Sequence, residues 1–165
     1  MPTSFQVAPK TLLSPWKDFF REIDDLLDEP LELHCVGGFV ACSFYGLPRP
    51  TGDVDFYTAV PSGLNLNDIA GEGSALAKKH KIHLRHAGVM SLPEDYTMRL
   101  AEIAPGQYKY LKLLALDPYD FILSKLERNI ERDRDDAGHV FKTQKLDVKI
   151  LRERYEHELR PYLST

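Results

Sequence analysis

The segment "CVGGFVACSFYGLPRPTGDVDFYTA" (residues 35–59) combines three features that are ordinary when each is taken alone. Gly37 and Gly38 end an apolar run, a proline-flanked turn follows later, and Asp53 and Asp55 then enclose a single valine. Residues two apart on a strand point to the same face, so the two carboxylates are predicted to lie side by side. The segment therefore predicts a strand, a glycine turn, a helix and a second strand that carries an acidic pair.

Two adjacent carboxylates repel each other, and a divalent cation relieves that repulsion. One or two Mg²⁺ ions held by Asp53 and Asp55 would carry the phosphates of a nucleoside triphosphate. Gly37 and Gly38 are the candidate phosphate cradle, because glycines between a strand and a helix let backbone N–H groups approach a phosphate. Each feature has a simpler explanation, a tight turn for the glycines and an exposed edge strand for the aspartates. Their combination in this order favours a phosphate site.

The composition is that of an ordinary globular protein. The chain has 165 residues, of which 43% are hydrophobic and 28% charged, and a formal net charge of -4. This length suits one domain with its own core. No stretch approaches the roughly 20 apolar residues of a membrane span, and the first ten residues lack the layout of a signal peptide. We therefore expect a cytoplasmic protein with no membrane contact, whose Cys35 and Cys42 are free thiols.

The apolar pattern predicts an α+β protein. The predicted elements are, in order, a helix begun by Ser14 and Pro15, a strand over 31–36, a helix over 38–45, a strand over 53–59, a helix over 67–79, strands in "KIHLRHA", "YTMRLAEI" and "YKYLKLLAL", and helices over 118–130, 132–143 and 147–162. We expect a single domain over 1–165, with a core over about 17–117 and a helical carboxyl-terminal part over about 118–165.

The segment "VGGFVACSFYGLPRPTGDVDF" resembles the signature of the nucleotidyltransferase superfamily with a polymerase-β-like core. That signature is a strand, a glycine pair, a helix and two aspartates set among hydrophobic residues. The turn is similar to that of a bacterial subgroup that contains the AbiEii-type abortive-infection toxins and small uncharacterised relatives. The matching residues are Gly46, Arg49, Thr51, Asp53 and Asp55. The resemblance implies a nucleotidyltransferase-like mixed sheet flanked by helices, with Asp53 and Asp55 as metal ligands and Arg49 as a phosphate contact.

A second match lies in "LDPYDFILSKLERNIERDRDDAGHV", residues 116–140. The same subgroup carries Pro-x-Asp, then Ser/Ala-Lys-Leu, then a charged cluster, and the residues that fit are Pro118, Asp120, Lys125, Leu126, Arg132, Asp133 and Asp136. If one helix continued through this stretch, Lys125 and Asp136 would share one stripe with Asn129 and Arg132. Lys125 would then bind phosphates and Asp136 would orient it. The alternative is a solvated helix laced with i,i+4 ion pairs.

The match to the superfamily lacks one part. Catalytic members normally supply a third carboxylate from a neighbouring strand. The predicted strand "YKYLKLLAL" contains no acid, and Asp117 follows at its end. Glu102 is the other candidate for a third metal ligand, and the downstream acids Asp133, Asp135 and Asp136 are further alternatives. The gap bears on catalysis more than on the fold.

Two further patterns favour plain structural explanations. A histidine recurs at every third position in "HKIHLRHA", but successive ones point to opposite faces of a strand, which disfavours a zinc site at His80, His83 and His86. A dense basic run consists of Lys78, Lys79, Lys81 and Arg85. It could contact an RNA backbone, but a solvated helix end explains it more simply.

The predicted function is Mg²⁺-dependent transfer of a nucleoside monophosphate from a nucleoside triphosphate to a hydroxyl of RNA or protein. The predicted catalytic residues are Asp53, Asp55, Lys125 and Asp136, and the predicted nucleotide contacts are Gly37, Gly38, Arg49 and Lys125. The resemblance implies a toxin–antitoxin or phage-defence role with a cognate protein partner. Two alternatives stay open: a non-catalytic module that binds a nucleotide or a partner on this scaffold, and a small RNA-binding antitoxin.

Overall fold

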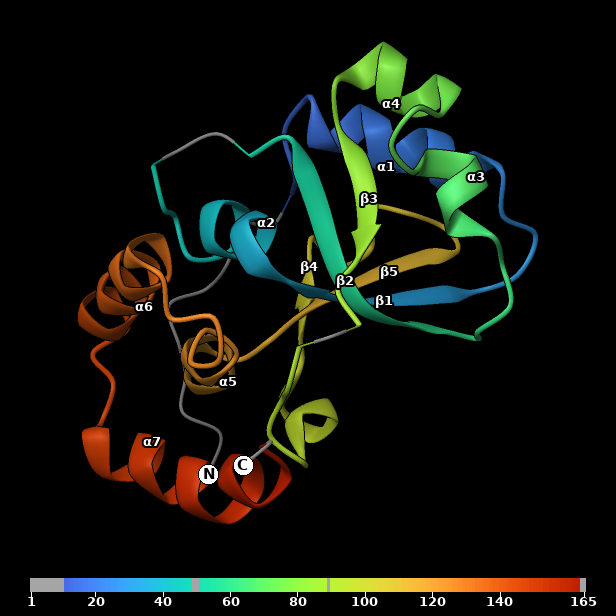
Figure 1. Cartoon of the computed structure of the whole chain (residues 1–165). Coiled ribbons are helices and arrows are strands. Elements are labelled where there is room, and N and C mark those ends of the chain that lie inside the picture. The colour runs from blue at the N-terminus through green and yellow to red at the C-terminus, as the bar shows by residue number, and fades with distance from the viewer. Residues whose placement is uncertain (1–10, 49–50, 89, 164–165) are drawn as a thin grey trace. The chain divides into compact units, whose positions relative to one another are not determined.

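The computed structural model describes residues 11–48, 51–88 and 90–163, and Figure 1 shows its elements. By its internal contacts the chain divides into two compact units. The sheet unit comprises the described residues up to 88 together with 102–115, and the helical unit comprises 90–101 and 116–163. The helical unit thus takes in a segment from the middle of the predicted core. The assignment of one domain over 1–165 stays a prediction.

A five-stranded mixed sheet forms the centre of the sheet unit, in the strand order β3-β2-β1-β5-β4 (Figure 1). The central strand β1 (Leu31–Val36) runs antiparallel to β2 (Asp53–Val60) and parallel to β5 (Leu111–Ala115). On the far side of β2, β3 (His83–His86) pairs in parallel, and β4 (Ala101–Ile103) lies beside β5. The predicted α+β class with a mixed sheet is confirmed.

The burial of β1 and β2 follows their sequences. In β1, Leu33, Cys35 and Val36 are fully buried, as expected of a central strand covered on both faces. Over residues 53–56 of β2 the burial alternates: Val54 and Phe56 are buried, whereas Asp53 and Asp55 are partly exposed. The alternation predicted for this strand is therefore confirmed.

The two cysteines are free thiols, as predicted. Burial raises the pKa of the Cys35 thiol to about 12, so this cysteine behaves as a small core residue.

Within the described part of the chain, no helix has both the length and the apolar character needed to cross a bilayer.

Helices complete the core of the sheet unit. α1 (Trp16–Asp25) buries Phe19, Phe20 and Ile23 and packs on β5. α2 (Gly37–Ser43) leaves β1 without an intervening loop and packs on β1 and β2. This direct exit places the glycine pair at the end of the central strand.

The helix predicted over 67–79 is two helices, which corrects the expectation. α3 (Leu66–Ala70) begins after Asn65, whose side chain caps it, and α4 (Ala75–His80) begins after Ser74, which caps it in turn. Between them Gly71 is extended and Gly73 has a φ of +85°. These two glycines leave the helical region of backbone space, so the helix ends and a new one starts.

The strand predicted for "YTMRLAEI" is also corrected. Tyr96–Arg99 forms a 3₁₀ turn in the helical unit, and only Ala101–Ile103 pairs as β4. Arg99 has long-range acidic partners in the helical unit. The alternation of apolar residues within "YTMRLAEI" carries no information about these distant partners.

The described residues of the helical unit contain three α-helices. α5 (Pro118–Leu123), α6 (Glu131–Thr143) and α7 (Val148–Arg154) follow one another, and a π turn and a 3₁₀ turn continue α7 to Tyr162. The predictions over 132–143 and 147–162 match closely. The helix predicted over 118–130 ends at Leu123 instead, and Asn129 has a left-handed φ of 44°. The single helical stripe expected to run from Lys125 to Asp136 is therefore wrong.

Candidate functional site

The acidic pair Asp53 and Asp55 lies on the half-exposed face of β2, next to an arginine of β3. The parallel register places Arg85 directly opposite Asp55. The Nε and Nη2 atoms of Arg85 donate to the two carboxylate oxygens of Asp55, at 2.8 and 3.0 Å. The Nη1 atom of the same side chain lies 3.3 Å from Oδ2 of Asp53. One guanidinium group thus bridges both carboxylates.

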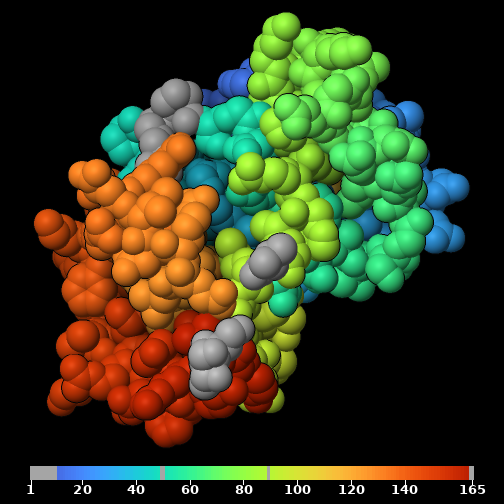
Figure 2. Space-filling model, viewed as in Figure 1, coloured from blue at the N-terminus to red at the C-terminus, as the bar shows by residue number. Residues whose placement is uncertain are grey.

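Solvent reaches this cluster. The Arg85 side chain is 58% exposed, against 29% for Asp53 and 14% for Asp55. Figure 2 shows atoms of the β3 segment, in yellow-green, at the surface of the sheet unit. The hydroxyl of Thr51 lies 3.1 Å from the carbonyl and 3.2 Å from a carboxylate oxygen of Asp53, which fits the structural role of a residue in the turn before the strand. The acidic pair is thus contacted by Arg85 and Thr51 and stays partly exposed to solvent.

The glycine pair lies against the acidic pair. The register of β1 and β2 pairs Val36 with Asp55, so the chain enters the glycine turn beside that carboxylate. Gly37 has a φ of +70°, and a Cβ atom built there would lie 2.8 Å from Oδ2 of Asp55. A Cβ atom on Gly38 would lie 3.4 Å from Oγ1 of Thr51. The neighbourhood of the two motifs, which the sequence only suggested, is present in the sheet unit.

Glu102 does not join the acidic pair, which corrects its candidacy as a metal ligand. It lies on β4, and β1 and β5 stand between that strand and β2. Three strand spacings correspond to about 14 Å, far beyond the reach of a shared ion. Among the described residues, no three His, Cys, Asp or Glu side chains gather closely enough to hold a metal ion. Opposite Asp55, the neighbouring strand β3 presents an arginine.

Three other basic or histidine side chains of this region have partners within the sheet unit. Lys79 forms an ion pair with Glu22, and His80 lies 3.1 Å from the other oxygen of the same carboxylate. His86 contacts the carbonyl of Tyr57 at 3.0 Å. The basic run is thus partly engaged within the sheet unit, as expected of a solvated helix end. Arg49, the predicted phosphate contact, lies outside the described residues.

Lys125 and Asp136 lie in the helical unit and are close to each other. The Nζ atom of Lys125 is 3.6 Å from Asp136, 3.5 Å from Asp133, and 5.3 Å from the ring centroid of Phe121. The lysine side chain is 9% exposed and both aspartates 1%. α5 and α6 pack together, and this tertiary contact pairs the two residues without a shared helical stripe. Their roles in catalysis stay predictions.

The sequence model of a family described as "Nucleotidyltransferase of unknown function (DUF6036)" matches residues 16–163. The chain belongs to this family. Its general activity is accordingly nucleotidyl transfer, and a nucleotidyltransferase binds nucleotide substrates. The superfamily predicted from the glycine and acidic pairs is confirmed, whereas the AbiEii-like subgroup is not. No curated protein and no solved structure matches the chain.

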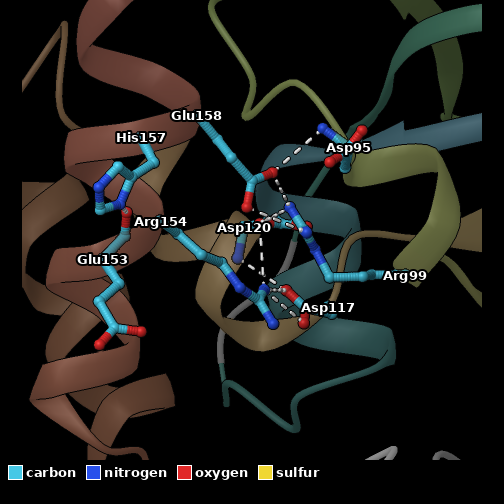
Figure 3. A network of polar contacts seen from close by, with 8 residues as sticks. All are labelled: Asp95, Arg99, Asp117, Asp120, Glu153, Arg154, His157 and Glu158. Atoms are coloured by element: carbon cyan, nitrogen blue, oxygen red, sulfur yellow. Dashed lines mark hydrogen bonds and ion pairs between the residues drawn. The ribbon is translucent and has the colours of Figure 1, made fainter.

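This nucleotidyltransferase also contains an ionic network that the sequence did not reveal (Figure 3). Arg99 donates to both carboxylate oxygens of Asp120, at 2.8 and 3.0 Å, and to Glu158 at 2.8 Å. Arg154 lies 2.7 Å from Asp117 and 3.2 Å from Asp120. Within this network, the sequence signals only the link between Asp117 and Asp120. Asp117 stands directly before a proline, which is the pattern of a residue that caps a helix, and it caps α5.

Asp120 is the centre of this network. Its side chain is fully buried, and burial raises its pKa to about 6, against the opposing effect of the hydrogen bonds from Arg99. The network joins the 3₁₀ turn, α5, the end of α7 and the π turn that follows it. Its geometry is that of a structural anchor of the helical unit in this nucleotidyltransferase.

Proposed function

We propose that the protein transfers a nucleoside monophosphate from a nucleoside triphosphate to a hydroxyl group of RNA or protein, with Mg²⁺ held by Asp53 and Asp55. The observation that carries the proposal is the contact of the glycine turn with the acidic pair, seen in the 2.8 Å approach of a Gly37 Cβ position to Asp55. Nucleotide-bound Mg²⁺ typically takes one or two protein carboxylates and completes its shell with phosphate oxygens and water. The two aspartates fit that requirement.

Three residues of the chain would bind the triphosphate beside the metal ion. Bound Mg²⁺ would neutralise phosphate charge and orient the oxygens for an in-line displacement. Gly37 and Gly38 would place backbone N–H groups against the triphosphate, since neither has a side chain in the way. The helix that they begin, α2, has only seven residues, so the backbone donors and not a helix dipole support this assignment. Arg49 would neutralise charge on the phosphates.

Lys125 and Asp136 complete the proposed catalytic residues. Lys125 would bind phosphate oxygens and Asp136 would orient its ammonium group, and the 3.6 Å contact between them supports this pairing. A phosphate would have to compete with Asp133 and Asp136 for the lysine, because both carboxylates already balance its charge.

One observation favours the alternative of a non-catalytic binding module. The strand next to the acidic pair offers Arg85 and not a third carboxylate, and the described residues contain no three-ligand metal group. A site with two carboxylates still binds a metal–nucleotide complex, but it lacks a further carboxylate to act as the base that takes the proton of the attacking hydroxyl. A toxin–antitoxin or phage-defence role, with RNA or a cognate protein as partner, stays a prediction of the resemblance.

Isothermal titration of the four nucleoside triphosphates, with and without Mg²⁺, tests the proposal. We expect binding that needs both Mg²⁺ and the acidic pair, and therefore its loss in Asp53→Asn/Asp55→Asn. The matched control is Asp25→Asn/Asp28→Asn, which removes the same two charges from exposed positions. Incorporation of label from an α-labelled triphosphate into RNA or protein then separates the enzyme from the module. Folded protein that gives no heat with any nucleotide would contradict the proposed function.

A further inference from the structure

Arg85 occupies the space between the two carboxylates that the proposed function assigns to a metal ion. Its guanidinium uses both oxygens of Asp55 and approaches one oxygen of Asp53 at 3.3 Å. These are the oxygens that would coordinate a divalent cation. An ion entering between the aspartates must break at least one of these contacts, and until then it meets a positive charge at close range.

The arginine is placed to leave without disturbing the fold. β3 is an edge strand of the sheet, and its register with β2 is set by backbone pairing. The Arg85 side chain is 58% exposed, so it can rotate into solvent or onto a ligand. A partly exposed ion pair of this kind contributes modestly to stability. The bridge is therefore strong enough to compete with an ion and weak enough to be displaced.

We propose that Arg85 is a built-in counterion of the acidic pair, which disfavours a free divalent cation and moves onto the phosphates when a metal–nucleotide complex binds. This inference rests on the proposed function. A guanidinium group pairs with phosphate in the same two-point manner as with carboxylate. The triphosphate thus supplies the partner that releases Arg85 from Asp53 and Asp55, and metal and triphosphate bind with positive coupling.

Mn²⁺ binding, measured by electron paramagnetic resonance, tests the inference with Mn²⁺ alone and with Mn²⁺–tripolyphosphate as probes. Tripolyphosphate carries no base, so the choice of nucleotide does not matter. Arg85→Gln is expected to bind Mn²⁺ alone about fivefold more tightly than wild type, because an exposed pair is worth up to about 1 kcal/mol. The preference for Mn²⁺–tripolyphosphate over Mn²⁺ alone is expected to fall by at least the same factor.

Two further variants separate the effect of charge and of position from the effect of the bridge. Arg85→Lys retains the charge but cannot bridge both carboxylates through a planar group, so its Mn²⁺ affinity should lie between those of wild type and Arg85→Gln. Arg21→Gln is the matched control, since its guanidinium lies over the ring of Tyr108 and not on the acidic pair. Circular dichroism and thermal unfolding check that every variant is folded.

The outcomes separate this inference from the proposed function. Equal Mn²⁺ affinity in wild type and Arg85→Gln, with binding lost in Asp53→Asn/Asp55→Asn, would overturn the counterion and leave the metal site standing. An unchanged preference for Mn²⁺–tripolyphosphate in Arg85→Gln would overturn the coupling. If neither protein bound either probe, or if the double aspartate variant bound both normally, the proposed function and this inference would fall together.

Discussion

Gly37 shows how one residue serves both fold and site. Its φ of +70° lies in the left-handed region, which costs other residues free energy, and its missing side chain leaves room for Oδ2 of Asp55 at 2.8 Å from a Cβ position. Sequence patterning placed the glycine and the aspartate in one predicted phosphate site but did not show that they touch. Their contact depends on the register of β1 and β2, which pairs Val36 with Asp55.

The Gly37→Ala substitution is therefore expected to lower the free energy of unfolding by about 2 kcal/mol and to weaken metal–nucleotide binding. Gly46→Ala is the matched control, because Gly46 has a nearly identical φ of +71° but nothing within 4 Å of its Cβ position. Urea denaturation measures the stability and titration calorimetry the binding. Equal losses of binding in the two variants would show that the contact with Asp55 is irrelevant to the site.

A second prediction at this scale concerns Asp133. The bidentate hydrogen bonds from Arg128 lower the pKa of its carboxyl to about 2 from an ordinary 3.8. A lowered pKa in the folded state means that the carboxylate stabilises the protein above about pH 4, and this contribution is lost as pH falls through about 2.

The Asp133→Asn substitution should accordingly lower stability at pH 7, by about 2 kcal/mol, and flatten the acid limb of the stability profile. Asp135→Asn, on the same helix but exposed, is the control and should leave both unchanged. Denaturant titrations between pH 2 and 7 give the profile. An acid limb of unchanged slope in Asp133→Asn would contradict the assignment.

At the scale of elements, local patterning predicted most of the helices and strands and failed where a turn or a distant partner decided the outcome. The alternation of β2 and the apolar run of β1 were sufficient to predict both strands, because the burial of each strand follows the apolar pattern of its own residues. The helix predicted to continue to residue 130 ends at Leu123, and the "YTMRLAEI" strand begins with a 3₁₀ turn. Both errors lie in the helical unit, where ion pairs such as that of Arg99 with Glu158 connect segments that are distant in the sequence.

The Arg99→Met substitution tests the weight of these ion pairs. It leaves Asp120 buried and short of a partner, so we expect the free energy of unfolding to fall by about 3 to 5 kcal/mol. The double variant Arg99→Met/Asp120→Asn should regain part of that loss, because it removes the uncompensated charge as well. Arg152→Met, at an exposed position of α7, is the control. Urea denaturation of the four proteins completes the comparison, and a double variant less stable than Arg99→Met would contradict it.

The pH dependence around Asp120 has the opposite sign to that of Asp133. Burial raises its pKa to about 6, so the folded protein holds this proton more tightly than the unfolded chain does. The contribution of Asp120 to stability is then greatest below about pH 4 and falls as pH rises toward about 6. Asp120→Asn should remove this fall, which the difference between its unfolding free energy and that of wild type across pH 4 to 7 would reveal.

At the scale of the whole molecule, the order of sequence patterns determined the fold class and the residues of the candidate site. The order of strand, glycine pair, helix and acidic pair is a local property of residues 35–59, and it led to the superfamily that the family match over 16–163 confirms. Only the tertiary structure decided what surrounds the acidic pair. Strand order excluded Glu102, and strand register placed Arg85 opposite Asp55. The physical reason is that a strand's two faces are set by its own alternation, whereas its neighbour and register are set by contacts between residues far apart in the chain.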